Sequence, residues 1–142
     1  MQNLFEKNSY SYHLTKENKQ RKFTITSSIS LETIEDIIVT AFECSSMVYW
    51  ATLDNTGPSW KDCPDDFPCS QWAINILIDG DIIKLLINDG EEKERETSFD
   101  LQKLLEAIGK AISEYDVDLN NIDGEVADII IQLALFDEVV YG

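Results

Sequence analysis

The C-terminal stretch of the chain, residues 122–142, combines an apolar helix face with charges of a single sign. Five apolar side chains recur in it at intervals of three and four residues, which is the spacing of a helix that buries one stripe. They are Val126, Ile129, Ile130, Leu133 and Phe136. From residue 111 to the end there is no Lys or Arg, against eight acidic residues. The stretch is therefore predicted to pack on the core through one helix face and to display carboxylates on the other.

The length of the chain, 142 residues, fits one domain, since roughly two-thirds of the surface of such a chain is buried on folding. Residues 1–21 are polar, weakly basic and without sustained periodicity, so they are predicted to form an N-terminal arm, and residues 22–142 a single domain. The sequence has no apolar run of about 18 residues, which a membrane-spanning helix needs. Its first residues lack the apolar core of a signal peptide. A cytoplasmic protein is expected.

Hydrophobic periodicity and capping residues predict the remaining elements. Strands are expected at residues 22–29, 47–53, 71–78, 81–88 and 91–99, and helices at 31–44, 101–115 and from 124 onward. The expected N-caps are Ser30, Ser98 or Asp100, and Asp123. Residues 54–70 contain all three prolines and are expected to be a long loop. After the last helix, the tail is predicted to be an edge strand or a segment that a partner contacts.

Two Asp-Gly pairs, at residues 79–80 and 89–90, are predicted to be the turns of two hairpins, because Asp-Gly suits the positive φ angles of two-residue turns. The first two of the joined strands are apolar on both faces and belong at the sheet centre, whereas the third is mostly charged and belongs at an edge. The predicted fold is α+β, with an antiparallel sheet of about four to five strands and three helices packed mainly on one face.

The charge balance excludes some classes of partner. The formal net charge is −16, and after the first 22 residues the chain has six basic residues against 25 acidic ones. Such a body repels phosphate, so direct binding to nucleic acid or to an anionic membrane is not expected. It is instead steered toward basic surfaces, including one that normally holds nucleic acid. High solubility alone is the alternative explanation of the charge.

The sequence contains no catalytic or metal-binding signature. The single histidine, His13, lies in the predicted arm, and no Gly-rich phosphate loop is present. The three cysteines, Cys44, Cys63 and Cys69, are an odd number without an export signal, which disfavours structural disulfides. The spacing of Cys63 and Cys69 is not that of a structural zinc pair. We expect no enzymatic activity, no metal and no cofactor.

Five aromatic residues lie in or beside the long loop. They either form the wall of a pocket that stacks a nucleotide base or another planar ligand, or pack as core and loop anchors without any ligand. The residues are Tyr49, Trp50, Trp60, Phe67 and Trp72.

Two runs carry a resemblance to a known group. They are Thr40-Ala41-Phe42-Glu43, followed by Tyr49-Trp50, and residues 127–142, which end in Tyr-Gly. In these runs the chain resembles a group of small acidic proteins that phages and prophages of gut bacteria carry. The resemblance covers residues 30–142 and leaves the N-terminal arm outside. It implies a phage setting, without an activity that can be carried over.

In that setting, we expect a non-enzymatic phage accessory protein of the anti-defence, anti-CRISPR-like kind. It is predicted to bind and inhibit a basic, nucleic-acid-handling host protein by presenting carboxylates where that protein expects phosphates, as a DNA mimic does. The alternatives are a nucleotide-sequestering or other small-molecule module that uses the aromatic residues, and a structural phage protein that self-associates, for example as a homodimer. The predicted partner-binding carboxylates are Asp62, Asp65, Asp66, Glu114, Asp116, Asp118, Glu125, Asp128, Asp137 and Glu138.

Overall fold

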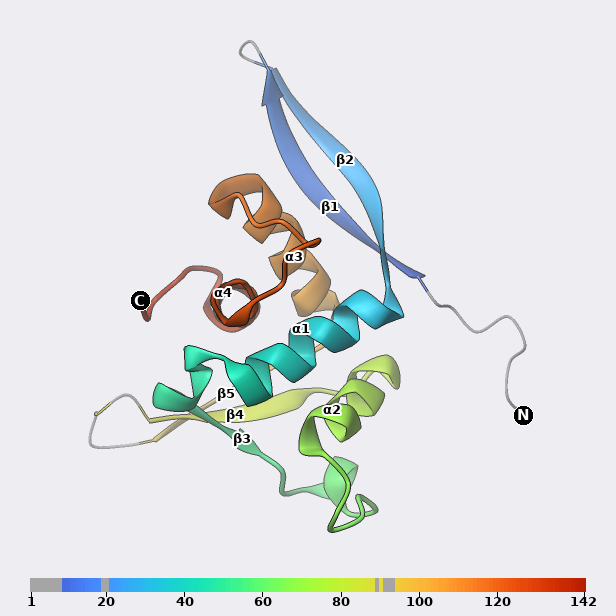
Figure 1. Cartoon of the computed structure of the whole chain (residues 1–142), viewed down its shortest axis with the longest axis vertical. Coiled ribbons are helices and arrows are strands. Elements are labelled where there is room, and N and C mark those ends of the chain that lie inside the picture. Colours follow the sequence, from blue (N-terminus) through green and yellow to red (C-terminus); the bar gives the residue numbers. More distant parts are fainter. Residues whose placement is uncertain (1–8, 19–20, 89, 91–93) are drawn as a thin grey trace.

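The computed structural model, which describes residues 9–18, 21–88, 90 and 94–142, contains two antiparallel sheets and four α-helices (Figure 1). The α+β class is confirmed, but the predicted single sheet is wrong, because the strands form a separate hairpin and a three-stranded sheet. In chain order the elements are β1 (Ser9–Asn18), β2 (Arg21–Ser30), α1 (Leu31–Cys44), the 3-10 helix η1 (Ser46–Tyr49), β3 (Ala51–Asp54), the 3-10 helix η2 (Pro58–Trp60), α2 (Cys69–Ile78), β4 (Ile83–Ile87), β5 (Arg95–Phe99), α3 (Leu101–Tyr115) and α4 (Gly124–Phe136).

Helix α1 lies in the middle of the molecule and joins its two halves. It packs against α4 on one side and against α2 on the other, with α3 and the β1–β2 hairpin above it and the three-stranded sheet below it in Figure 1. The three-stranded sheet has the order β3-β4-β5, in which Ala51 is opposite Ile87 and Ile83 is opposite Phe99. The charged strand β5 lies at an edge and the apolar strand β4 at the centre, as predicted.

The predicted strand at residues 71–78 is wrong, because this segment is part of helix α2. Its Asp-Gly pair ends the helix in a Schellman motif: the Gly80 amide donates to the Leu77 carbonyl and the Asp81 amide to the Ile76 carbonyl, each at 3.0 Å. Gly80 has φ +88°, which suits this position as well as a hairpin turn. The second predicted hairpin turn includes Asp89, which lies outside the described residues.

The predicted N-terminal arm contains a strand that the sequence reasoning missed. β1 pairs with β2 over ten residues, from Ser9 opposite Ser30 to Asn18 opposite Arg21. Tyr12 and Leu14 are buried, so β1 alternates between apolar and polar side chains as a half-buried strand does. The predicted strand at residues 22–29 is confirmed as β2, and residues 1–8 of the predicted arm lie outside the described residues.

The other predicted elements are confirmed or shortened. The side chains of Ser30, Asp100 and Asp123 accept hydrogen bonds from backbone amides in the first turns of α1, α3 and α4. These contacts confirm three predicted N-caps. The predicted strand at residues 47–53 begins instead as η1, and only β3 is extended. The loop before α2 contains η2. No helix in the described part of the chain is long and apolar enough to cross a membrane.

Helices α1 and α4 both contribute fully buried residues to the core. Ile34, Ile37 and Ile38 of α1 are fully buried, and so are Ile130 and Ile131 of α4. α4 is buried over more of its circumference than the predicted stripe, since seven of its 13 residues are buried. This wider burial includes two polar residues, Asp128 and Gln132, and it shapes the candidate site described below.

The hairpin docks on α3 through a glycine. A Cβ atom added to Gly109 would overlap the backbone carbonyl oxygen of His13, so only glycine lets β1 approach the helix this closely. Nearby, the Thr15 amide donates to the Ser113 hydroxyl at 2.8 Å. A two-stranded hairpin is marginal by itself, and contact with α3 therefore stabilises it.

Replacing Gly109 with Ala tests this docking. Alanine normally stabilises a helix interior by about 0.8–1.0 kcal/mol over glycine, but here we expect a net loss of about 1–3 kcal/mol because the side chain overpacks the contact with β1. Urea unfolding measures the change, with Gln102→Ala on the exposed face of the same helix as the control. A higher unfolding midpoint for Gly109→Ala would show that the close contact is absent.

Candidate functional site

A buried polar network joins α4 to the segment after α1. Asp128 is 8% exposed and Gln132 is fully buried. One carboxylate oxygen of Asp128 accepts a hydrogen bond from the Trp50 indole N–H at 3.0 Å, and the other accepts one from the Gln132 amide at 2.8 Å. The prediction that Asp128 belongs to an acidic surface is therefore wrong. Its carboxylate is an interior acceptor, and the stripe predicted for α4 was too narrow.

Gln132 also holds the C-terminal tail. Its amide nitrogen donates to the Tyr141 carbonyl at 2.8 Å, and its carbonyl oxygen accepts from the backbone amides of Val140 and Tyr141 at 2.7 and 2.8 Å. With the bond to Asp128, both donors and both lone pairs of the amide are used. Gln132 thus makes three of the hydrogen bonds that hold the tail. The alternative that the tail forms an edge strand is wrong.

An aromatic cluster covers this network. The Trp50 ring stacks on Tyr141, with centroids 4.9 Å apart and an interplanar angle of 15°, and contacts Phe136 at 5.8 Å. Sequence reasoning assigned no individual role to Gln132, and it treated Tyr141 only as part of the tail and of the run that carries the resemblance. The sequence did contain a signal for Gln132, which is the one amide side chain within an apolar run of the helix. A buried amide requires hydrogen-bond partners, so its position indicates a buried polar contact.

A groove lies beside the network, where the start of α4 meets the end of α1. Its volume is about 1010 Å³. The start of α4 can lie this close to the end of α1 because residue 124 is a glycine. A Cβ atom at Gly124 would lie 2.6 Å from the Cys44 carbonyl oxygen. The groove is lined by Cys44, Ser45, Ser46, Tyr49, Trp50, Gly124, Glu125, Asp128, Ile129, Val139, Tyr141 and Gly142.

The five aromatic residues predicted for one pocket lie in two places. Tyr49 and Trp50 line the groove, whereas Phe67 contacts Trp72 edge to face at 5.8 Å beside α2. The Trp72 indole donates to the Ser59 carbonyl at 2.8 Å, and Trp60 is buried in the core. Only the first pair lines the groove. The Phe67–Trp72 pair anchors the loop before α2, as the alternative interpretation expected.

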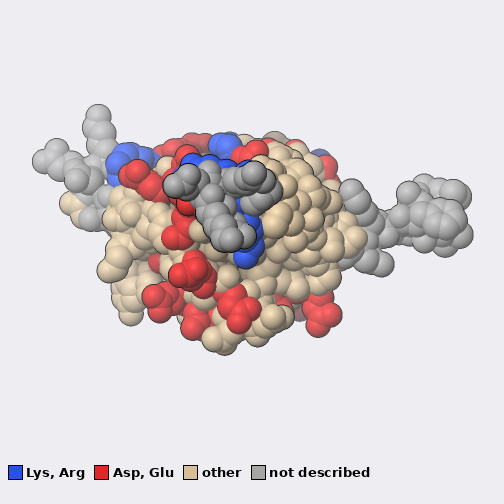
Figure 2. All heavy atoms as spheres, turned by 90° about the horizontal axis from the view of Figure 1, so that it is seen from above, with Lys and Arg blue, Asp and Glu red and all other residues tan. Residues whose placement is uncertain are grey.

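The predicted carboxylates other than Asp128 are exposed, but they do not form one surface. Asp62, Asp65 and Asp66 lie on the segment before α2, at the bottom of Figure 1, whereas α3, α4 and their connection lie above α1. Seen from above, the lowest part of the view shows Asp and Glu side chains, whereas Lys and Arg side chains are visible in its upper and central parts, where further Asp and Glu side chains also lie (Figure 2).

Two of the predicted carboxylates are paired with a lysine. The Lys110 ammonium donates to the Asp137 carbonyl at 2.6 Å and lies 3.2 Å from the Asp137 carboxylate and 3.8 Å from that of Glu114. The hydrogen bond to Asp137 raises the pKa of Lys110, and the charges of Asp137 and Glu114 add to this shift while partial burial opposes it. Lys110 thus links the middle of α3 to the end of α4.

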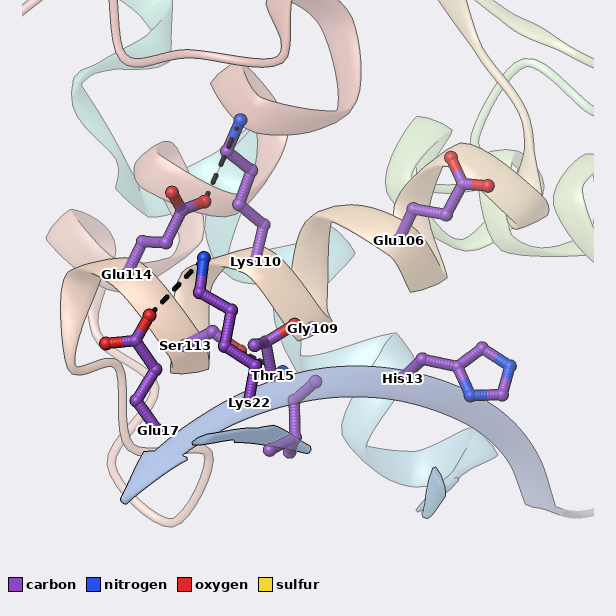
Figure 3. A pocket seen from close by; sticks show the side chains of 10 residues that line it. His13, Thr15, Glu17, Lys22, Glu106, Gly109, Lys110, Ser113 and Glu114 are labelled. Carbon is purple, nitrogen blue, oxygen red and sulfur yellow. Dashed lines mark hydrogen bonds and ion pairs between the residues drawn. The ribbon is translucent and has the colours of Figure 1, made fainter. Parts of the chain in front are cut away.

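A second hollow, of about 510 Å³, lies between β1 and α3 (Figure 3). Its lysines face carboxylates: Lys22 lies 3.4 Å from Glu17, and Lys110 lies 3.8 Å from Glu114. The His13 ring points away from these pairs, and its Nδ1 is 3.0 Å from the Thr26 hydroxyl. The opposite charges of this hollow offset one another.

The cysteines are free thiols. Partial burial raises the pKa of Cys63, and the neighbouring Cys69 and Asp65 add to the shift. The Cys63 thiol is therefore protonated at neutral pH and is a weak nucleophile. Among the residues that the structure describes, no three His, Cys, Asp or Glu side chains gather as metal ligands would.

Replacing Gln132 with Met tests the network. Methionine keeps the volume of the side chain but leaves the Val140 and Tyr141 amides without their acceptor, so we expect a loss of about 2 kcal/mol in the free energy of unfolding. Urea unfolding followed by tryptophan fluorescence reports both the stability and the environment of Trp50. The same substitution at the exposed Gln71 is the control, with an expected change within about 0.5 kcal/mol. Equal effects of the two variants would contradict the role of Gln132.

The chain was also compared with known proteins. Neither protein-family models, nor curated protein sequences, nor solved structures gave a match.

Proposed function

We propose that this chain is a non-enzymatic binding protein that inhibits a basic, nucleic-acid-handling host protein through an acidic surface. The observation that supports the proposal is the acidic ridge, which we define as the exposed carboxylates that follow one another from the end of α3 to the first turn of α4. No Lys or Arg interrupts them in the sequence. The ridge comprises Glu114, Asp116, Asp118, Asp123 and Glu125.

The backbone of the ridge is ordered by its own hydrogen bonds. The Asp118 carboxylate accepts from the Asn120 amide at 2.9 Å, and its carbonyl accepts from the Asn121 amide at 3.1 Å. Val117 is buried and pins the connection to the core. An ordered segment loses little conformational entropy on binding, so the attraction of its carboxylates is kept as affinity.

The sign of the charge favours a particular class of partner. A groove that binds nucleic acid is lined by Lys and Arg, and a ridge of carboxylates complements it while repelling nucleic acid itself. An acidic protein in such a groove blocks access of the normal ligand without any chemistry. The resemblance to small acidic phage proteins supports this setting, in which host nucleases are the targets of inhibitors.

Capture from a bacterial lysate by the immobilised chain, at about 50 and at about 200 mM salt, tests the proposal. We expect basic, nucleic-acid-handling proteins to be retained at the lower salt concentration and released at the higher one, since the attraction is screened. Mass spectrometry identifies what is retained. Retention of no such protein at low salt would refute the proposal.

Charge-neutralising variants locate the surface. The triple variant Glu114→Gln, Asp116→Asn, Asp118→Asn removes three charges from the ridge, and Asn keeps the left-handed backbone of Asp116, whose φ is +53°. We expect it to weaken capture and to reduce the dependence of affinity on salt. The matched control removes three charges from the segment before α2, by Asp62→Asn, Asp65→Asn and Asp66→Asn. Equal effects of the two variants would show that net charge, and not the ridge, controls binding.

A further inference from the structure

The floor of the groove beside Trp50 contains a buried carboxylate with neutral partners. The donors to Asp128 are the Trp50 indole and the Gln132 amide, and neither carries a charge. The described residues that line the groove include no Lys or Arg. A buried carboxylate is costly unless a cation compensates it. Because each oxygen of Asp128 accepts one described bond and has a second lone pair, a cationic group that enters the groove gains both charge compensation and acceptors.

An exposed tyrosine belongs to the same lining as Asp128. Tyr49 is 83% exposed on η1 and lines the groove. The hydroxyl of the other lining tyrosine, Tyr141, already accepts a bond from Arg95 at 3.2 Å, and the Tyr141 ring stacks on Trp50. Tyr49 therefore offers the open aromatic face of the groove. Glu125, which is exposed in the first turn of α4, adds a second carboxylate to the lining.

We propose that this groove binds an arginine side chain of the basic partner. The inference rests on the proposed function and names the contact through which the partner is recognised. A guanidinium is planar, so it stacks on an aromatic ring while its N–H groups reach carboxylates, whereas an ammonium group has no flat face to stack. The hollow between β1 and α3 lacks this selectivity, because its own lysines already face its carboxylates.

Two peptides of equal charge, tetra-arginine and tetra-lysine with blocked ends, serve as probes for the full chain. Titration followed by tryptophan fluorescence and by calorimetry measures both affinities. We expect the arginine peptide to bind about two- to five-fold more tightly than the lysine peptide, since a guanidinium stacks flat on the Tyr49 ring and an ammonium group does not. Glu125→Gln should weaken both peptides, and Tyr49→Ala should abolish the preference for arginine.

The control for Tyr49→Ala is Tyr115→Ala, because Tyr115 is 39% exposed on α3 and does not line the groove. It should keep the preference for arginine. Equal affinity for the two peptides, or a preference that survives Tyr49→Ala, would overturn the assignment of the groove. If the Tyr49→Ala variant still captures a basic protein in a salt-sensitive way, the arginine site is refuted and the proposed function is not. If the chain captures no basic protein but still prefers the arginine peptide, the proposed function is refuted and the groove remains an arginine site.

Discussion

The hydrogen bonds of the Gln132 amide hold the C-terminal end of the molecule together. A fully buried side chain on α4 binds the backbone of the tail and the carboxylate of Asp128, and it thereby places Tyr141 against Trp50. Such a network is stable only when each member finds its partners, because the low dielectric of the interior makes an unsatisfied amide costly. One wall of the groove and the carboxylate on its floor both follow from this arrangement.

In the acidic ridge, buried apolar side chains pack on the core while the charged side chains are exposed. The acidic ridge lies on the connection between α3 and α4, where Val117 supplies the buried anchor and the carboxylates point to solvent. Lys110 braces α3 against the end of α4 and partly offsets the repulsion there. A net charge of −16 would otherwise oppose compaction through self-repulsion. Packing of α1 against both α2 and α4 keeps the two halves of the molecule together.

Elements with local signals could be predicted from the sequence, and elements that depend on distant contacts could not. Helices α1, α3 and α4 carry their own caps at Ser30, Asp100 and Asp123, so their starts were predictable. Helix α2 was mistaken for a strand because Asp-Gly suits both a hairpin turn and a helix end. The apolar face of β1 is short, and its packing depends on Gly109, about a hundred residues later in the chain. The burial of Asp128 depends on Trp50, which no local pattern reports.

We propose that the acidic surface occupies the site where the partner holds nucleic acid. The most direct measurement is the anisotropy of a labelled DNA duplex bound to a captured partner, followed as this chain is added. We expect displacement of the duplex, with an apparent affinity that falls steeply as salt is raised. A ternary complex, in which the duplex stays bound while the chain binds the partner, would contradict it.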